Sequence, residues 1–225
     1  MTRHQASNVS VPRRKPQQSR SRLTSMALQE AFVRLLPERG YEALTIREIV
    51  DVAGTGLGSF YEYFANKEDL ARVSIHLRTK VLLQTIRDTV ALQRGQPLRE
   101  MLDAIIHALT DIHREHPAQW AVHYLIERRI SDAAAYSKMY DRFVKAWADA
   151  ITAAADASTD KAHILEVART CHTIIYGLFA HAHIQAFATG GSAPDLQRLL
   201  QQSLQGLLGY LDCADVYRTA RQNAH

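Results

Sequence analysis

The chain has 225 residues, a formal net charge of +4 and a hydrophobic content of 47%. This length suits one small and one larger domain, and ten glycines with six prolines leave little room for a loop-rich β fold. No apolar run approaches the roughly 20 residues that cross a bilayer, and the N-terminus has no apolar signal-peptide core, so we expect a soluble, cytoplasmic protein without a membrane partner.

Basic residues are concentrated at the start of the chain. Residues 1–22 carry six arginines and lysines and no acid, which leaves a net charge of −2 on the rest. Pro12, Pro16 and several Ser and Gln residues predict a segment that is disordered when free. We expect part of this basic arm to neutralise DNA phosphates; the alternative is a solvated leader.

Residues 23–36 place apolar side chains at helical spacing and predict a first helix, with Gly40 as its stop. Phe32 and Leu36, four residues apart, are expected in the core. Pro37 lies where a proline kinks or ends a helix.

Residues 45–64 predict two short helices joined by a tight turn. Thr45 and Glu48 have the spacing of a capping box, which satisfies free amides at a helix start. Glycines at 54 and 56 permit the turn between the two helices. Such a pair is a helix-turn-helix, whose second helix fits the DNA major groove. The expected partner is therefore double-stranded operator DNA.

The remaining chain reads as helices without a strand-length alternation. The helices are expected over 67–93, 98–114, 117–130, 133–151, 161–188 and 195–211. The fold class is therefore all-α. A three-helix DNA-binding domain is expected over 23–70, a larger helical ligand-binding and dimerisation domain over 71–215, and a tail over 216–225. The helix that begins at Lys67 is expected to couple the two domains.

Glu38 to Leu70 contains the strings ERGYEALTIREI, AG, GSFYEYF and NKEDL. This stretch resembles the N-terminal domain of the TetR family of bacterial transcriptional regulators, over roughly residues 23–73. Gly56 departs from the Ser-like cap that is frequent there, and Leu57 departs from a polar or basic residue.

Leucines at helical spacing over 195–211 give an apolar face wider than one partner helix would bury. Paired with the helix over 161–188, this face predicts a homodimer with a four-helix interface, as in the resembled family.

Ten residues are candidates for DNA contact: Thr45, Arg47, Thr55, Gly56, Leu57, Gly58, Ser59, Tyr61, Tyr63 and Lys67. The resemblance implies that the later hydroxyls and Lys67 hold phosphates, and that the start of the second helix faces base edges. Thr55 and Leu57 suit base edges, because a hydroxyl donates or accepts and an apolar side chain meets a thymine methyl. The alternatives are a core role for Tyr61 and packing within its own domain for Leu57.

Aromatic residues recur on successive helices of the larger domain and predict a pocket for a small apolar or aromatic effector. Similar stripes also occur in plain cores, which is the alternative. The candidate lining comprises Ile105, Leu109, Trp120, Tyr124, Tyr140, Phe143, Trp147, His172 and Tyr176.

Histidines and cysteines predict neither a metal site nor a cofactor. His113 and His116 are three residues apart, but no cysteine joins them and no HExxH motif occurs. Cys171 and Cys213 lie in apolar helical segments and are expected to be buried, reduced thiols; the alternative is a disulfide or a redox switch.

The predicted function is a DNA-binding transcriptional repressor that a small ligand releases from its operator. One alternative is a ligand-independent architectural DNA-binding protein, against which the size of the second domain argues. The other is a small helical enzyme. No nucleophile elbow or paired-carboxylate motif supports it, and the glycines at 54, 56 and 58 follow a helix rather than a strand.

Overall fold

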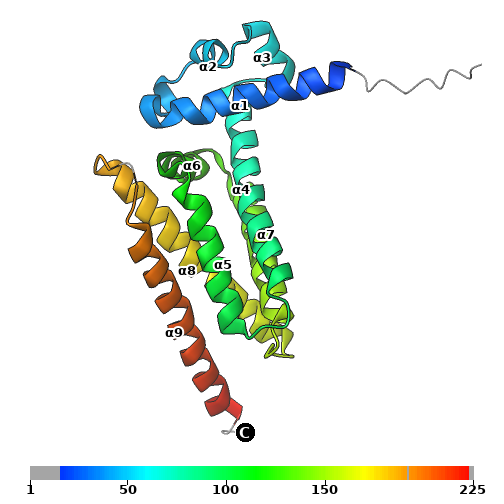
Figure 1. The fold of residues 1–225 in the computed structure, drawn as a ribbon, viewed down its shortest axis with the longest axis vertical. Coiled ribbons are helices and arrows are strands. Elements are labelled where there is room, and N and C mark those ends of the chain that lie inside the picture. Colours follow the sequence, from blue (N-terminus) through cyan, green and yellow to red (C-terminus); the bar gives the residue numbers. More distant parts are fainter. Residues whose placement is uncertain (1–15, 192, 223–225) are drawn as a thin grey trace, which may run out of the picture.

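The computed structural model describes residues 16–191 and 193–222, with side chains from 21 to 213, and this part of the chain forms nine helices and no strand. The helices are α1 (Pro16–Ala43), α2 (Ile46–Val52), α3 (Leu57–Tyr63), α4 (Lys67–Leu92), α5 (Leu98–Arg114), α6 (Pro117–Ile130), α7 (Ala133–Ala153), α8 (Lys161–Ala188) and α9 (Leu196–Gln222). The predicted all-α fold is confirmed. In Figure 1, α1 to α3 form a head at one end, and α4 runs from the head into a body made of the other helices.

The first and last helices are longer than predicted. α1 begins at Pro16 and passes through Pro37, and its regular geometry breaks only at Gly40, where φ is 70°. Gln and Arg side chains before Leu23 are good helix formers, although they lack the apolar spacing on which the prediction relied. α9 continues to Gln222, through part of the expected tail. Residues 1–15 of the basic arm lie outside the described residues.

The helix-turn-helix forms where the sequence predicts it. The Thr45 hydroxyl accepts a hydrogen bond from the Glu48 amide at 3.2 Å, and the Glu48 carboxylate accepts one from the Thr45 amide at 2.9 Å. The capping box is therefore complete. After α2 the chain turns at Gly54, whose φ of 65° favours glycine, and α3 begins three residues later.

The core of the head is wholly apolar and extends into the body. Phe32, Leu36 and Phe60 are buried in one cluster, as predicted for the first two. The same cluster includes three residues of α6: Val122, Ile126 and Ile130. The head is thus joined to the body by packing against α6 as well as by the continuous helix α4.

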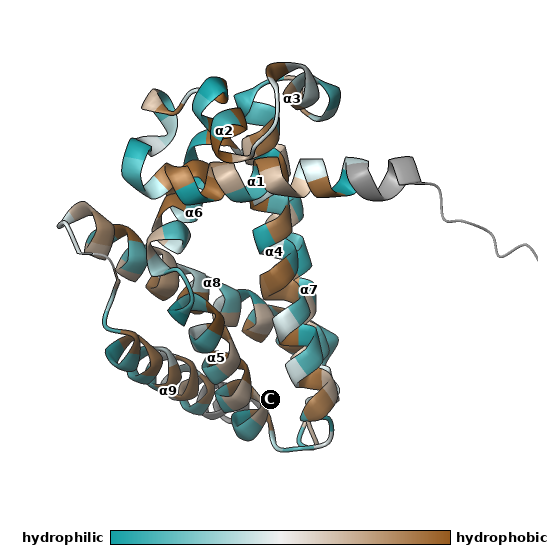
Figure 2. Ribbon diagram, turned by 45° about the horizontal axis from the view of Figure 1, so that its top comes forward, coloured by the Kyte–Doolittle hydropathy of each residue, from teal (hydrophilic) through white to brown (hydrophobic). Residues whose placement is uncertain are grey.

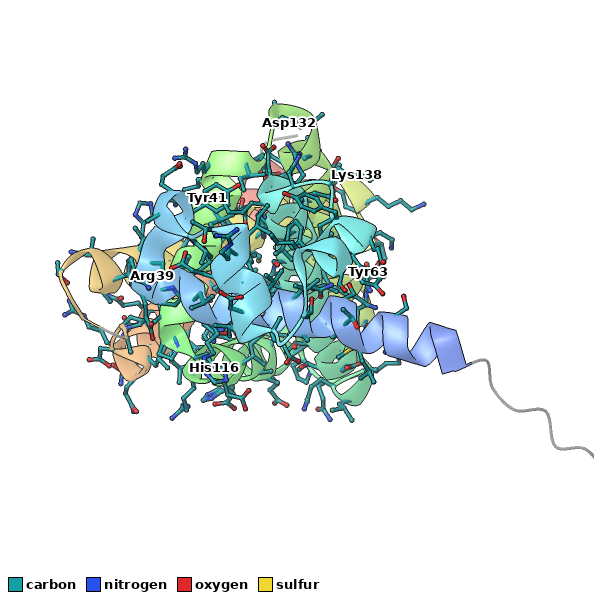
Figure 3. The ribbon with its side chains drawn as sticks, turned by 90° about the horizontal axis from the view of Figure 1, so that it is seen from above. Arg39, Tyr41, Tyr63, His116, Asp132 and Lys138 are labelled. Atoms are coloured by element: carbon teal, nitrogen blue, oxygen red, sulfur yellow. The ribbon has the colours of Figure 1, made fainter. Side chains whose placement is uncertain are left out.

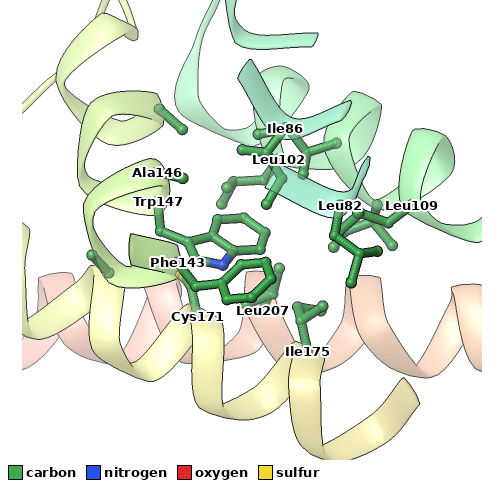
Figure 4. Close-up of a cluster of buried hydrophobic side chains, with 14 of the residues drawn as sticks. Leu82, Ile86, Leu102, Leu109, Phe143, Ala146, Trp147, Cys171, Ile175 and Leu207 are labelled. Atoms are coloured by element: carbon green, nitrogen blue, oxygen red, sulfur yellow. The ribbon is translucent and has the colours of Figure 1, made fainter. Parts of the chain in front are cut away.

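A second cluster fills the body, where α4 to α9 meet. Figure 4 shows Trp147 and Phe143 of α7 beside Cys171 and Ile175 of α8. In Figure 2, hydrophilic and hydrophobic residues alternate along these helices, as helices with one buried face require. None of the helices in the described part of the chain is long and apolar enough to span a membrane.

The two cysteines differ in exposure. Cys171 is buried, as predicted, and burial raises the pKa of its thiol to about 12. The prediction was wrong for Cys213, which is exposed. Cys213 is the second residue after buried Leu211. A step of two residues corresponds to about 200° around a helix, so its side chain lies on the opposite face.

Candidate nucleic-acid interface and ligand pocket

The start of α3 is exposed on the surface of the head. Gly56, Leu57 and Gly58 are exposed, whereas Phe60 is fully buried and anchors the helix to the core. Leu57 is 39% exposed and Tyr61 58% exposed, although both are large. This short helix packs against the core through Phe60, and its N-terminal end is exposed. A recognition helix needs this geometry.

Only one of the three glycines in this region is required by the backbone. Gly54 has positive φ, whereas Gly56 has φ of −100° and Gly58 lies within α3. A Cβ at either of the latter two positions would meet no heavy atom within 4 Å. The fold therefore tolerates side chains at both positions, and their absence leaves the backbone open to close approach by another molecule.

Most of the other predicted contact residues lie on α3 itself, on α2 or in the turn between them. Arg47 is exposed, and Thr55, Ser59 and Tyr63 are half-buried. Figure 3, viewed from above the head, shows Tyr63 beside α1. Thr45 is exposed, but its hydroxyl both accepts from the Glu48 amide and donates to the Glu48 carboxylate at 2.8 Å. Its first role is to cap α2.

Lys67 has an additional structural role that the sequence did not reveal. Its ammonium donates to the carbonyl oxygens of Tyr41 at 2.6 Å, Leu44 at 2.7 Å and Glu42 at 3.3 Å. It also lies 4.6 Å from the centroid of the Tyr41 ring. These carbonyls follow the break at Gly40, so Lys67 ties the end of α1 to the start of α4.

An apolar cavity lies inside the body. Its lining comes from five helices: Leu82, Ile86, Leu109, His113, Tyr124, Phe143, Trp147, His172, Ile175, Tyr176 and Phe179. Six of the nine predicted residues belong to it, whereas Ile105, Trp120 and Tyr140 do not. Ile105 is fully buried in the core, and Tyr140 packs edge-on against the lining residue His172 with ring centroids 5.1 Å apart.

Leu82 and Ile86 of α4 were missed because α4 was regarded only as a connector. Their spacing of four residues on a long amphipathic helix was the available signal. The cavity volume is about 40 Å³, far below the roughly 300–1,000 Å³ of typical ligand pockets. A drug-sized molecule would therefore have to displace side chains to enter.

His113 is the most constrained polar group of the cavity. Its Nδ1 lies 2.7 Å from the carbonyl oxygen of Leu109 and must donate to it, so Nε2 accepts from the Tyr124 hydroxyl at 2.9 Å. Burial lowers the pKa of His113 to about 3, which keeps the ring neutral and preserves this pattern. Burial also lowers the pKa of His172 to about 4.

A buried carboxyl lies beside the cavity. The Tyr176 hydroxyl donates to Glu127 Oε1 at 2.8 Å, and His123 Nε2 lies 3.5 Å from Glu127 Oε2. Burial raises the pKa of Glu127, although the hydrogen bond from Tyr176 opposes the shift. Tyr176 lines both the cavity and a surface pocket, so it separates the interior from solvent.

Trp120 connects the cavity to the head instead of lining the cavity. One face of its indole stacks on His113, with centroids 4.1 Å apart, and the Arg78 guanidinium lies 4.6 Å from the ring. Arg78 also donates to Gln119 at 2.5 Å and lines a small hollow against Phe32 of α1. Burial lowers the pKa of Arg78 to about 10, so the side chain stays charged at neutral pH.

The head is a helix-turn-helix with an exposed second helix, and it is joined to a helical body that contains a cavity. This arrangement is that of a two-domain helix-turn-helix protein. Family models agree with this class. Residues 29–73 match the model of bacterial regulatory proteins of the tetR family, and residues 97–211 match that of the tetracyclin repressor-like C-terminal domain. The chain belongs to the TetR family.

Individual relatives share only a modest part of their sequence with this chain. The chain is 30% identical over 127 residues to the HTH-type transcriptional repressor KstR2 of Mycobacterium tuberculosis, a match that covers 55% of this chain and 62% of that protein. A putative TetR-family regulator from Mesorhizobium loti has a TM-score of 0.67 at 15% identity, covering 86% of this chain and 98% of the other. The SmeT–triclosan complex has a TM-score of 0.63 at 20% identity, covering 83% and 90%. These two structures support the fold.

Proposed function

We propose that the protein is a cytoplasmic transcriptional repressor that binds operator DNA as a homodimer and leaves it when a small apolar or aromatic effector enters the body. One observation carries this proposal. The open recognition helix and the apolar cavity belong to one chain and share the helices that connect them. The repressor activity named for KstR2 and the triclosan bound to SmeT are consistent with both halves of the proposal.

Base recognition is assigned to the start of α3. Thr55 and Leu57 would meet base edges, while Arg47, Ser59, Tyr61 and Tyr63 would hold phosphates on either side. Gly56 and Gly58 would let the backbone approach the groove. Selecting bound sequences from random DNA should return a two-fold symmetric operator. Changes at Thr55 or Leu57 should alter the preferred base at one position in each half-site, at about 1–3 kcal/mol for each base pair.

The homodimer is assigned to α8 and α9. In α9, Leu199, Leu207 and Leu211 are buried against the rest of the chain, whereas Leu196, Leu200, Leu204 and Leu208 are only half-buried. This second row would complete its burial against the same row of a second copy, as an isologous contact. Sedimentation of the purified protein should therefore give a dimer, and a monomer at micromolar concentration would contradict the assignment.

Two physical connections would carry the effector's influence to the head. α4 has 26 residues, about 39 Å at 1.5 Å per residue, and contributes Leu82 and Ile86 to the cavity. α6 contributes Tyr124 to the cavity and packs Ile126 on the opposite face against the head. Because the cavity must widen to admit a ligand, these helices must move apart.

Movement of α4 or α6 changes the separation of the two recognition helices, which must be about 34 Å for both half-sites to be engaged. The effector can shift this equilibrium only by the difference between its affinities for the two arrangements. A coupling of about 1–3 kcal/mol would weaken operator binding several-fold to a hundredfold.

The decisive experiment is a ligand screen by thermal shift, followed by operator titration with each hit. Release should be reciprocal, so operator DNA should weaken ligand binding by the same factor. A ligand that binds but leaves operator affinity unchanged, or raises it, would contradict release while leaving the DNA-binding assignment intact.

A further inference from the structure

A basic cleft lies on the surface of the body just below the head. It is formed by the first half of α4, the end of α6 and the first half of α7, and its volume is about 290 Å³. Its lining consists of Arg72, Ile75, His76, Thr79, Ile130, Ser131, Ala135, Lys138, Met139 and Arg142. We refer to this set of residues as the α4–α7 cleft.

The charges of the α4–α7 cleft are of one sign. Arg72, Lys138 and Arg142 are cationic, His76 can become so, and no described residue of the lining is acidic. Arg72 is paired with Glu68 at 2.5 Å outside the cleft. Lys138 and Arg142 have no ion-pair partner among the described residues. Figure 3 shows Lys138 at the edge of the body as seen from the head.

Asp132, in the loop before α7, acts on Arg72 alone among the cleft cations. The pKa of Arg72 is raised by its hydrogen bond with Glu68 and, to a smaller extent, by the charge of Asp132. Asp132 accepts a hydrogen bond from the Ala135 amide at 2.7 Å, where it caps α7. Cations from two helices that converge on a hollow raise the local concentration of anions. Because a guanidinium and an ammonium both bind phosphate oxygens well, the chemistry of the cleft favours a phosphate-bearing group.

The floor of the cleft leads toward the internal cavity. Thr79 of α4 lines the cleft, and Leu82, three residues later, lines the cavity. Met139 of α7 lines the cleft, and Phe143, four residues later, lines the cavity. Thr79 and Met139 meet between the two spaces, with hydroxyl and sulfur 3.7 Å apart. A methionine is unbranched and adopts new rotamers easily, so this partition is a movable one.

We propose that the effector is an anionic amphiphile whose apolar part enters the internal cavity while a phosphate-bearing head group occupies the α4–α7 cleft. This inference rests on the proposed function and specifies the effector's chemistry. The cavity alone is too small for a complete effector and offers it no cation. The cleft supplies the cations, and displacement of Met139 joins the two volumes. A ligand held in this way contacts α4 on two successive turns.

Three compounds test the two parts of the proposed ligand, each used below any micellar concentration. Decyl phosphate carries both the apolar chain and the phosphate, decanol carries only the chain, and inorganic pyrophosphate carries only phosphate. Binding is measured by calorimetry and by tryptophan fluorescence, because one of the two tryptophans, Trp147, lines the cavity. The test variant is Lys138→Gln/Arg142→Gln. Its matched control, Lys80→Gln/Lys161→Gln, removes the same charge from exposed positions on α4 and α8 outside the cleft.

We expect the wild type to bind decyl phosphate more tightly than either decanol or pyrophosphate. The test variant should lose about tenfold or more in affinity for decyl phosphate, because each charge-assisted hydrogen bond contributes at least that factor. Its affinity for decanol should not change, and the control should behave as the wild type. An unchanged affinity of the test variant for decyl phosphate would overturn the proposal, as would pyrophosphate binding equal to that of decyl phosphate.

Operator titrations keep this inference distinct from the proposed function. Without ligand, the test variant should bind operator as the control does. A weaker affinity with a reduced salt slope would instead assign Lys138 and Arg142 to DNA phosphates and overturn the proposal. The test variant can lose affinity for decyl phosphate while decyl phosphate leaves operator affinity unchanged. That result would support the cleft as a phosphate-binding site and contradict release of the operator by the effector.

Discussion

The head and the body bury different kinds of side chain. Among the described side chains, every buried polar residue belongs to the body, from Ser74 to Ser203, and none belongs to α1, α2 or α3. The head keeps its polar groups at the surface, where DNA can reach them, over a core that is apolar throughout. The body places histidines, tyrosines and a carboxyl beside a cavity. The stability of the body therefore depends on pH through buried titratable groups that the described part of the head lacks.

The largest expected effect is the acid sensitivity of the body. His113 and His123 have pKa values of about 3, and His172 about 4, because burial disfavours the charged ring. Below the ordinary value of about 6.5 the unfolded chain binds protons that the folded chain does not. Stability is therefore full above about pH 6.5 and falls as the pH drops toward the folded pKa values, by on the order of 2 kcal/mol for each histidine between pH 7 and pH 5.

Urea unfolding at the two pH values, followed by tryptophan fluorescence, measures this loss. His172→Phe should remove about one histidine's share of the pH dependence. His107→Gln is the control, because the His107 side chain is 53% exposed. An identical pH slope in His172→Phe and the wild type would contradict this account.

Removal of an aromatic anchor from the head tests how separate the two regions are. Phe60→Ala leaves a void in the core of the head and should cost about 3–5 kcal/mol of unfolding free energy. Because Val122 and Ile126 of α6 pack in the same cluster, helix content by circular dichroism and tryptophan fluorescence should shift to lower urea together. If the fluorescence transition stays in place, the head unfolds on its own. Exposed Tyr61→Ala should leave both transitions unchanged.

Lys67→Ala should destabilise the head by about 1–3 kcal/mol, because charge-assisted hydrogen bonds to three carbonyls are lost. Its operator affinity should fall with the fraction of folded protein, and the salt slope should stay that of the wild type. Exposed Arg47→Ala should show the reverse, with unchanged unfolding and a smaller slope. A Lys67→Ala protein of unchanged stability and reduced slope would instead support the phosphate role that the resemblance implies.

The smallest effect separates folding from DNA approach. Gly58→Ala should stabilise α3 by about 0.5–1 kcal/mol, because alanine is the better helix former and its Cβ meets no neighbour. The same methyl should weaken operator binding if the backbone lies against the groove. Gly54→Ala should instead destabilise the turn by about 1–2 kcal/mol. Equal operator affinity of Gly58→Ala and the wild type would place that backbone away from DNA.

The sequence predicted the helices well because their ends carry local signals. Asn66 caps α4, accepting from the Asp69 amide at 2.8 Å, and Gly40 breaks α1, both as expected. The role of Lys67 depends on carbonyls 23 to 26 residues earlier in the chain, which no local pattern reports. The DNA contacts and the dimer remain predictions.

The cavity was predicted mainly through its aromatic residues. Tyr124, Phe143 and Trp147 were identified, whereas Ile175 resembles any core residue until packing shows which face meets the void. Trp120 was assigned to the lining as an aromatic residue, but its ring stacks on His113 and lies close to the Arg78 guanidinium. The two-sided packing of α6 was not predictable, because an apolar helix does not reveal which of its partners belongs to the head.

The unequal exposure of the two cysteines allows the natural chain to be spin-labelled at a single site. Their thiols differ in reactivity, because Cys171 is buried with a raised pKa whereas Cys213 is exposed on α9. A nitroxide reagent should therefore modify Cys213 alone, without any mutation. In a dimer this gives one spin label on each subunit, and the distance between the two labels can be followed by electron paramagnetic resonance as DNA or effector is added.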